Sequence, residues 1–237
     1  MDILIFSDSI EDHWVHLQCI LEHLCEYNLH SKPEKCLFHM QKIEFLGFMV
    51  TPTGISMDTA KTNAVSVCLT PTNLKAVQVF LGFANFYCRF IVGFSDIVIP
   101  LICLTHKHTP FAWGPDHAKV FDTLKEAFTQ APILAHFNPD NPIVVETDAS
   151  DLVIAVIISQ ISPNNGDIHQ IMFYSHSMQP VELNYEIYNK EFLAIFGPSD
   201  NGATTSRALH MSYFVLSNNK NLKYFTTTKQ LMCHQVH

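Results

Sequence analysis

The sequence predicts an α+β fold, in which a largely helical first half is followed by a mixed sheet with helices packed on it. Apolar residues recur at three- and four-residue spacing over 11–27, 72–88 and 116–129, as on one face of a helix. Later, two apolar runs at 143–148 and 153–159 predict strands, and a turn at 162–166 containing Asn-Gly leads to a third strand at 169–175. A helical face at 185–196 and a last strand at 213–217 complete an order that suits a mixed sheet with a helix packed on it.

The composition indicates a chain that can form a real core. It has 237 residues, of which 48% are hydrophobic and 15% charged, with a mean hydropathy of +0.13. This balance excludes global disorder and is poorer in charge than most soluble domains. Lys plus Arg is 14 and Asp plus Glu is 22, which gives 14 − 22 = −8. The acidic balance argues against tight nucleic-acid binding by the chain as a whole.

The seven cysteines are scattered, and no two of them form a C-x-x-C pair. Zinc-finger spacing is therefore absent, and the set predicts reduced thiols in an intracellular protein, whose compartment the sequence does not give. No N-terminal secretory signal is predicted, because Asp2 and Asp8 interrupt the first apolar run. No run of apolar residues is long enough to predict a membrane span.

In the first half, residues 3–6 predict a strand that begins almost at the first residue, so we expect a domain cut within its core. The run 43–50 predicts a strand pair closed by the turn residues 51–54. Thr72 is the expected N-cap of the 72–88 helix. The helical stripes that we expect to be buried are Leu74, Val77, Leu81, Ala84 and Cys88, widened by Phe80, Phe83 and Tyr87, and then Val120, Leu124 and Phe128.

Several motifs along the chain resemble one family in the family's own order. They are Asp-Ile-Leu-Ile-Phe-Ser at 2–7, Phe-Leu-Gly-Phe at 45–48, Phe-Leu-Gly-Phe-Ala-Asn-Phe-Tyr at 80–87, Val-Glu-Thr-Asp-Ala-Ser-Asp at 145–151, Asn-Tyr at 184–185 with Lys-Glu at 190–191, and Lys-Asn-Leu at 220–222. Together they are similar to the C-terminal reverse transcriptase and RNase H region of gypsy-type LTR retrotransposon Pol polyproteins. The resemblance implies a palm remnant over 1–50, a thumb or connection over 51–109, and a truncated RNase H-like domain over 110–237.

The same resemblance implies chemistry that depends on magnesium. Phosphoryl transfer on nucleic acid uses two metal ions held by several carboxylates. Asp2 matches the second aspartate of the polymerase box, Met1 stands where the first should be, and the upstream palm and fingers of the polyprotein are missing. Leu46 and Gly47 match the hairpin that grips the primer end. We therefore expect a polymerase remnant without polymerase activity.

For the RNase H site, the resemblance assigns Asp148 to the first strand and Glu191 to the first helix, as catalytic and metal-binding positions. Asn218 stands at the third, degenerate position, where the family has an aspartate at the end of the fourth strand. A fourth acid has no candidate, and Ala155 replaces a glycine of the second strand. An amide offers one neutral oxygen in place of a carboxylate, so we expect weak magnesium binding and lost or marginal RNase H activity.

Other residue patterns predict structure more than chemistry. His13, His16 and His23 lie near helical spacing and predict a solvated helix face, whereas His106 and His108 predict a polar loop. The aromatic residues at 80–90 predict core packing and not base stacking. Three hypotheses follow for the chain: an inactive enzyme fragment, a non-catalytic module that binds an RNA–DNA hybrid, or a non-functional relic with exposed apolar surface.

Overall fold

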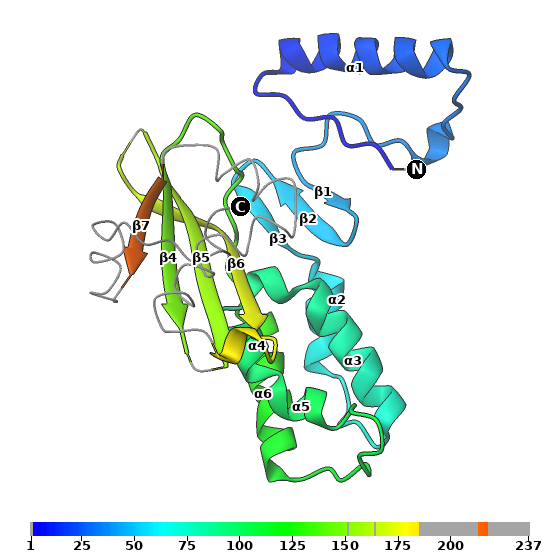
Figure 1. Ribbon diagram of the computed structural model, residues 1–237. Coiled ribbons are helices and arrows are strands. Elements are labelled where there is room, and N and C mark those ends of the chain that lie inside the picture. The colour runs from blue at the N-terminus through cyan, green and yellow to red at the C-terminus, as the bar shows by residue number, and fades with distance from the viewer. Residues whose placement is uncertain (1, 151, 164, 185–212, 218–237) are drawn as a thin grey trace. The chain divides into compact units, whose positions relative to one another are not determined.

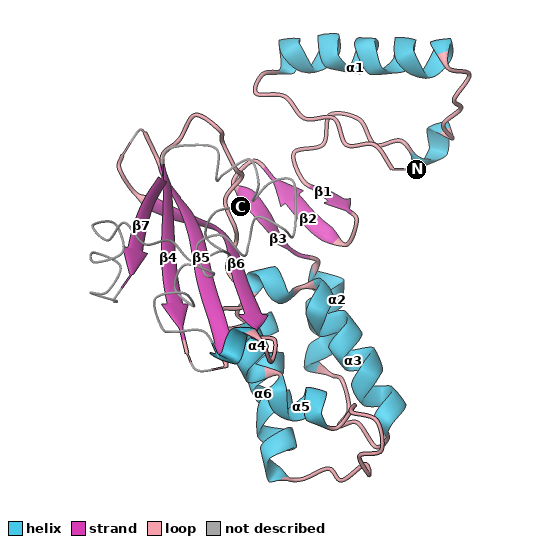
Figure 2. Ribbon diagram, in the orientation of Figure 1, coloured by secondary structure: helices cyan, strands magenta, loops and turns pink. Residues whose placement is uncertain are grey.

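A computed structural model describes residues 2–150, 152–163, 165–184 and 213–217, the last five and Ala149 by their backbone only. The chain divides into two compact units, Met1–Pro52 and Thr53–His237. Helices and strands occur in separate stretches of the chain, as expected for an α+β protein (Figures 1 and 2). Among the described residues, no helix is both long enough and apolar enough to cross a membrane.

The first unit is built around one long helix, α1 (Ile10–Glu26), which confirms the prediction for 11–27. Ser9 caps it, because the Ser9 hydroxyl accepts the Asp12 backbone N–H at 3.1 Å. The strand predicted for 3–6 is wrong. These residues form no strand, Phe6 is 83% exposed, and no described strand pairs with them. A short apolar run becomes a strand only where a neighbouring strand accepts its backbone hydrogen bonds.

A strand pair follows, as predicted, after one turn of 3₁₀ helix, η1 (Pro33–Lys35). The turn that closes the pair is at 46–47 and not at 51–54 as expected. Strand β1 (Ile43–Phe45) pairs antiparallel with β2 (Phe48–Thr51), with Phe45 opposite Phe48. The two residues between the strands, Leu46 and Gly47, have φ of 50° and 81°. Positive φ at both central positions is the mark of a type I′ hairpin turn, whose twist matches that of the strands.

The second unit opens with two elements that the sequence did not suggest, β3 (Gly54–Met57) and α2 (Thr59–Ser66). Asp58 caps α2 by accepting the Ala60 N–H at 3.1 Å. Ile55 forms an isolated bridge with Leu134, through N–H to O distances of 2.7 and 2.8 Å. Since the next residue, Ala135, donates its N–H to the Gln170 carbonyl at 2.8 Å, one short segment connects β3 to strand β6 (Ile168–Ser177) of the larger sheet.

Aromatic packing holds the helices of the second unit together. Helix α3 (Leu74–Phe86) has Asn73 and not Thr72 as its N-cap, because the extended Asn73 places its side-chain oxygen 2.9 Å from the Ala76 N–H. Its buried stripe packs on α6 (Pro115–Thr129), with the Phe80 and Phe121 rings 4.7 Å apart. Three short helices lie between them in the chain: η2 (Cys88–Phe90), α4 (Phe94–Ile97) and α5 (Ile99–Cys103).

The large sheet has the strand order β6-β5-β4-β7. Its strands are β4 (Ile143–Ala149), β5 (Val153–Ile161), β6 (Ile168–Ser177) and β7 (Tyr213–Ser217), which confirms the four strands predicted for the second half. β5 is antiparallel to both β4 and β6, whereas β7 is parallel to β4. A turn of 3₁₀ helix, η3 (Glu182–Asn184), follows β6. The helix predicted at 185–196 lies outside the described residues.

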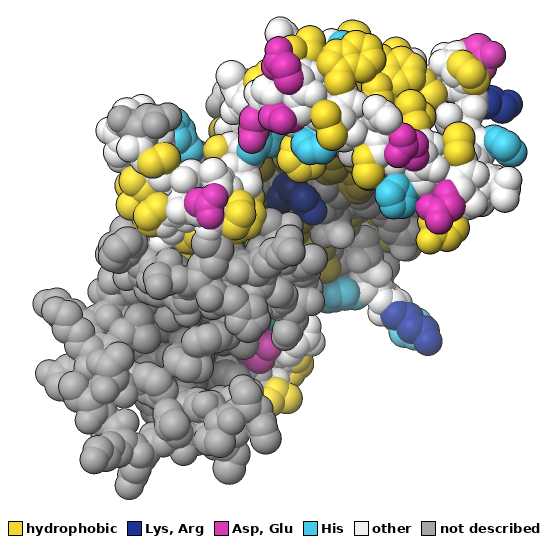
Figure 3. All heavy atoms as spheres, turned by 90° about the horizontal axis from the view of Figure 1, so that it is seen from above, with side chains coloured by type: hydrophobic (Ala, Val, Ile, Leu, Met, Phe, Trp, Pro, Cys, Tyr) yellow, Lys and Arg dark blue, Asp and Glu magenta, His cyan; other side chains and the backbone are white. Residues whose placement is uncertain are grey.

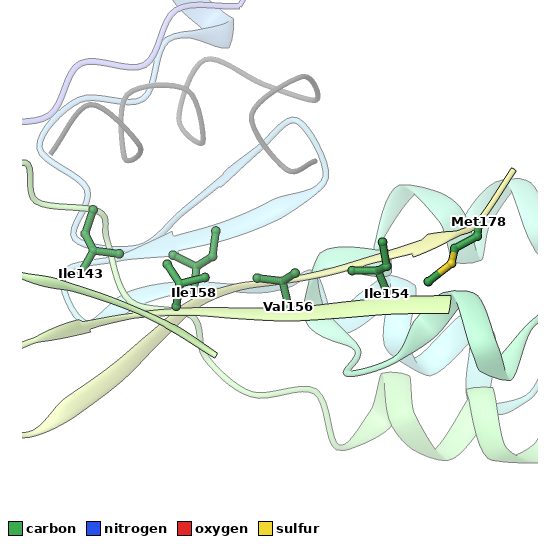
Figure 4. Packing of buried hydrophobic residues seen from close by; sticks show 6 residues of the cluster. Ile143, Ile154, Val156, Ile158 and Met178 are labelled. Carbon is green, nitrogen blue, oxygen red and sulfur yellow. The ribbon is translucent and has the colours of Figure 1, made fainter. Parts of the chain in front are cut away.

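One face of this sheet carries a buried aliphatic cluster (Figure 4), formed by Ile143, Val145, Ile154, Val156, Ile158 and Met178.

Gln160, only 3% exposed, closes one end of the sheet. Its side-chain oxygen accepts the Asn138 N–H at 2.9 Å, and its amide donates to the carbonyls of Asn138 and Asn141 at 2.5 and 3.2 Å. A buried amide whose groups are all bonded fixes the loop that leads into β4.

Candidate functional site

Strand β4 presents two different faces, and the candidate acid lies on the more polar one. Ile143, Val145 and Thr147 are buried on the face of the aliphatic cluster. Residues two apart share a face of a strand, so Val144, Glu146 and Asp148 lie on the opposite face, where Glu146 and Asp148 are both exposed. The alternation therefore directs the Asp148 carboxylate to solvent near the end of a central strand.

Small side chains surround Asp148 across the sheet. Ala155 of β5 is its register partner, and Ser175 of β6 is in turn the partner of Ala155. The Ser175 hydroxyl accepts the Ser95 N–H at 2.9 Å and donates to the Ser95 hydroxyl at 3.0 Å, which ties α4 to this row. The row formed by Asp148, Ala155 and Ser175 thus offers one carboxylate, one methyl group and a hydroxyl that is already hydrogen-bonded to Ser95.

Strand β7 brings the chain to the same edge as Asp148. It runs parallel to β4, with Val145 opposite Val215 and Thr147 opposite Ser217. Parallel partners end at the same edge of a sheet. Ser217 therefore ends β7 one register step before the level of Asp148. The two other predicted members of the site, Glu191 and Asn218, lie outside the described residues.

The described residues do not fit a metal centre. Among them, no group of three His, Cys, Asp or Glu side chains is placed to hold an ion. Asp148 is the one member of the predicted set that they include. Its register partner on β5 is Ala155, and β7 ends at Ser217, opposite Thr147. One carboxylate cannot hold a pair of divalent ions, each of which prefers several hard oxygen ligands. No catalytic step through a metal follows from this geometry.

Sequence reasoning missed a buried polar group beside Asp148. Thr147 is 7% exposed, and its hydroxyl is buried with no hydrogen-bond partner among the described residues. The hydroxyl faces the aliphatic cluster, since Thr147 alternates with Asp148 and lies opposite Val156. An unpaired buried hydroxyl is destabilising, so the strand that carries the candidate acid includes a local weakness. The sequence gives no sign of it, because β-branched threonine is ordinary in a strand.

The polymerase-related positions in the first unit are far apart in the sequence, and both are exposed. Asp2 is exposed, and Leu46 is 60% exposed at the tip of the β1–β2 turn. The predicted solvated histidine face of α1 is polar, but its three histidines are all engaged. The Ser7 hydroxyl lies 3.3 Å from His13 Nδ1 and 2.7 Å from His16 Nδ1, and His23 Nδ1 lies 2.8 Å from the Cys19 carbonyl oxygen. On the face in Figure 3, apolar side chains lie among acidic and histidine side chains.

The outer face of α3 is a second functional candidate that the sequence did not suggest. Lys75, Gln78, Val79, Gly82 and Phe86 lie at successive turns of the helix, and all are exposed, Val79 to 64% and Phe86 to 50%. The prediction of core packing at 80–90 is right for Phe80, Tyr87 and Phe90, which are buried, and wrong for Phe86. No acidic residue occurs in α3, although the chain as a whole has a net charge of −8.

Next to this face, burial raises the pKa of the Cys88 thiol, and the positive charge of Arg89 opposes that effect only in part. A raised pKa keeps the thiol protonated and poorly nucleophilic. Cys88 therefore contributes packing below α3 and not reactivity.

Two family models match this chain. The reverse transcriptase (RNA-dependent DNA polymerase) family matches residues 2–50, and the RNase H-like domain found in reverse transcriptase matches residues 113–198. Two polyproteins of Schizosaccharomyces pombe (strain 972 / ATCC 24843), those of transposons Tf2-3 and Tf2-4, are each 31% identical over 194 residues, which is 82% of this chain. The chain spans only 14% of the length of either polyprotein.

Solved structures show the same fold. The foamy viral protease-reverse transcriptase in complex with RNA/DNA hybrid matches 98% of this chain and 32% of its own, with a TM-score of 0.76 and 22% identity. A second structure of that viral protein, its dRH form in complex with double-stranded DNA, matches 96% of this chain and 40% of its own, also with a TM-score of 0.76 and 22% identity. Since sequence, element order and fold agree, the chain belongs to the reverse transcriptase and RNase H region of the gypsy-type LTR retrotransposon polyprotein family.

Proposed function

We propose that residues 1–237 form a reverse transcriptase and RNase H segment that does not polymerise DNA by itself and whose RNase H activity is lost or marginal. One observation carries the second part. The parallel strands β4 and β7 end at one edge, with Thr147 opposite Ser217, and the residue that follows Ser217 in the sequence is Asn218. The amide side chain of Asn218 supplies no negative charge to the proposed site.

The argument against RNase H activity is electrostatic. Two divalent ions bring four positive charges into a small volume, and the family offsets them with carboxylates and the substrate phosphate. Asp148 and Glu191 are the acids that we propose for this chain, and both are proposed to take part in metal binding. Two carboxylates and one amide are a poor ligand set for a pair of magnesium ions, since magnesium prefers charged oxygen ligands.

Cleavage of the RNA strand in an RNA–DNA hybrid tests this proposal. We expect no cleavage, or traces of it, by the unmodified chain with magnesium. We expect Asn218→Asp to increase cleavage and Asp148→Asn to remove any that remains. Rapid cleavage by the unmodified chain, at a rate that Asp148→Asn does not change, would contradict both the loss of activity and the proposed site.

The argument against polymerase activity rests on Asp2. It is the one residue of the polymerase box that we assign in this chain, it is exposed, and no group of three metal-binding side chains occurs among the described residues. Primer extension on an RNA template with magnesium or manganese is the test. We expect no extension by residues 1–237, and clear extension refutes this part of the proposal.

We also propose a division of the chain into a palm remnant at 1–50, a thumb or connection at 51–109, and an RNase H-like domain at 110–237. In the palm remnant, Leu46 and Gly47 form the primer-grip-like turn. What supports this role is the backbone: Leu46 has a φ of 50°, a conformation that a leucine seldom adopts, and it exposes 60% of its surface. An apolar side chain kept in a strained, exposed turn is typical of a contact residue.

A second function, binding of an RNA–DNA hybrid without cleavage, is favoured by the outer face of α3. Lys75 can contact a phosphate, and the exposed Phe86 ring offers a flat apolar surface, held edge-on against Tyr87 at 4.8 Å. Between them, a Cβ added to Gly82 would meet no atom within 4 Å, so the helix surface is open to close approach. This acid-free face suits a polyanion better than the chain's average charge does.

Fluorescence anisotropy with a labelled hybrid separates this binding function from an inert relic. We expect binding that weakens as salt rises, and a further loss in Lys75→Ala and in Phe86→Ala. Ile168→Ala is the matched control, since Ile168 is 58% exposed at the start of β6 and far from α3 in sequence. Equal affinity in all four proteins, or no salt-dependent binding, contradicts a role for the α3 face.

A further inference from the structure

The turn between β5 and β6 contains a chemical feature that nucleic-acid binding does not use. Asn165 and Gly166 are adjacent and exposed there, and Gly166 has a φ of 73°. The Asn165 amide donates to the Asp167 carboxylate at 2.5 Å, and its oxygen accepts the Asp167 N–H at 3.2 Å. We propose that Asn165 is a site of spontaneous deamidation, and that the hydrogen bonds of this turn control its rate.

The reaction joins two groups that are adjacent in the chain. Hydroxide removes the proton from the backbone nitrogen of Gly166. This deprotonated backbone nitrogen then attacks the side-chain carbonyl carbon of Asn165. A C–N bond forms, the bond from that carbon to the side-chain nitrogen breaks, and this nitrogen takes a proton from water and leaves as ammonia, which regenerates hydroxide. Water then opens the cyclic succinimide at either carbonyl, giving aspartate or isoaspartate. Gly166 favours the attack because it has no Cβ to hinder ring closure.

The folded turn opposes this attack. The Gly166 N–H donates to the Ser162 carbonyl at 2.9 Å, so the nucleophile is engaged, and both polar atoms of the Asn165 side chain are held by Asp167. The turn must open before the ring can close. Releasing about one net hydrogen bond predicts a rate roughly five- to tenfold slower than in an unfolded peptide of the same sequence.

Deamidation changes the interactions within the turn as well as the mass of residue 165. Aspartate at position 165 cannot donate a hydrogen bond, and its carboxylate faces that of Asp167, so attraction becomes repulsion. Isoaspartate adds a backbone atom to a short connection whose geometry fixes the pairing of β5 with β6. Either product is expected to weaken this end of the hairpin.

Peptide mapping by mass spectrometry tests the proposal in the full chain, at mildly alkaline pH and physiological temperature, beside a synthetic peptide covering 160–169. We expect a gain of one mass unit at Asn165, roughly five- to tenfold slower in the chain than in the peptide. Asn138 and Asn141 are internal controls, because each precedes a proline that has no N–H to attack, and neither should change. Asn165→Gln should remove the mass gain, since its ring closes far less readily.

Two results overturn the proposal. Suppose the chain is still unmodified after a time many times longer than the peptide needs for full conversion. Asn165 is then not a deamidation site in this protein. If chain and peptide react at the same rate while circular dichroism shows that the chain is folded, the turn's hydrogen bonds do not control the reaction. Equal modification of Asn138 or Asn141 would show that the reaction does not require the Gly166 N–H.

Discussion

Gly54 lies against the backbone of Leu134, and replacing it tests the connection between β3 and the large sheet. Its φ is +147°, and a Cβ added to it would lie 2.3 Å from the Leu134 carbonyl oxygen. That oxygen accepts the Ile55 N–H at 2.7 Å. A methyl group at this position therefore forces Leu134 away and breaks the bridge between Ile55 and Leu134.

The cost of Gly54→Ala follows from three terms. Two hydrogen bonds of the bridge, at 2.7 and 2.8 Å, are lost, and each contributes about 1 kcal/mol. The backbone conformation is one that non-glycine residues avoid, at a cost of about 1–3 kcal/mol. Alanine also stiffens the unfolded chain, which returns about 0.4–1 kcal/mol. We expect the free energy of unfolding to fall by about 2–5 kcal/mol.

Urea unfolding followed by Trp113 fluorescence measures this effect, in a Trp14→Phe background so that the signal comes from the second unit. Trp113 is a suitable probe because its ring lies 6.0 Å from that of the buried Phe121. Gly93→Ala is the matched control: Gly93 has a φ of +62°, but a Cβ there meets nothing within 4 Å. It should cost only about 1 kcal/mol. If the two variants are equally destabilised, the contact with Leu134 does not limit the fold.

Three other substitutions or reagents give shorter tests. Thr147→Val removes the unpaired buried hydroxyl and should leave the free energy of unfolding unchanged or raise it by about 1 kcal/mol. A decrease in the free energy of unfolding would mean that the hydroxyl has a hydrogen-bond partner. Leu46→Asn should raise the free energy of unfolding by about 1 kcal/mol, because asparagine tolerates the positive φ at this position. A lower free energy of unfolding in urea would refute strain at this turn. Burial raises the pKa of Cys88, so its labelling by a thiol reagent should begin at higher pH than that of the exposed Cys19, Cys25 and Cys103; labelling of all four at one pH would contradict the burial.

Periodicity predicted most of the elements, because long amphipathic patterns leave little choice of structure. The helix at 116–129 and the strands at 143–148 and 153–159 are examples, and the Asn-Gly turn gave the hairpin between β5 and β6. β3 and α2 were missed because they are short, and α2 has few apolar residues. The strand at 3–6 was predicted wrongly because hydrophobicity alone says nothing about the presence of a pairing partner.

The candidate site was predictable only in part, and for a similar reason. The apolar run at 143–148 correctly predicted the strand that carries Asp148, whose side chain is exposed. The orphaned Thr147 hydroxyl and the exposed Phe86 depend on which residues pack against them from distant parts of the chain. Such contacts leave no pattern in the local sequence. The roles of Glu191 and Asn218 stay predictions.

Calorimetric titration of magnesium into the unmodified chain and into Asn218→Asp tests the central claim most directly. A carboxylate placed about 4 Å from a divalent ion contributes about 2 kcal/mol even with the full screening of water, which corresponds to about thirtyfold tighter binding. We expect that gain in Asn218→Asp, and we expect it to disappear when Asp148→Asn is added. Equal affinity in the unmodified chain and Asn218→Asp, or a gain that survives Asp148→Asn, would contradict the claim that Asn218 is the defect in a site built on Asp148.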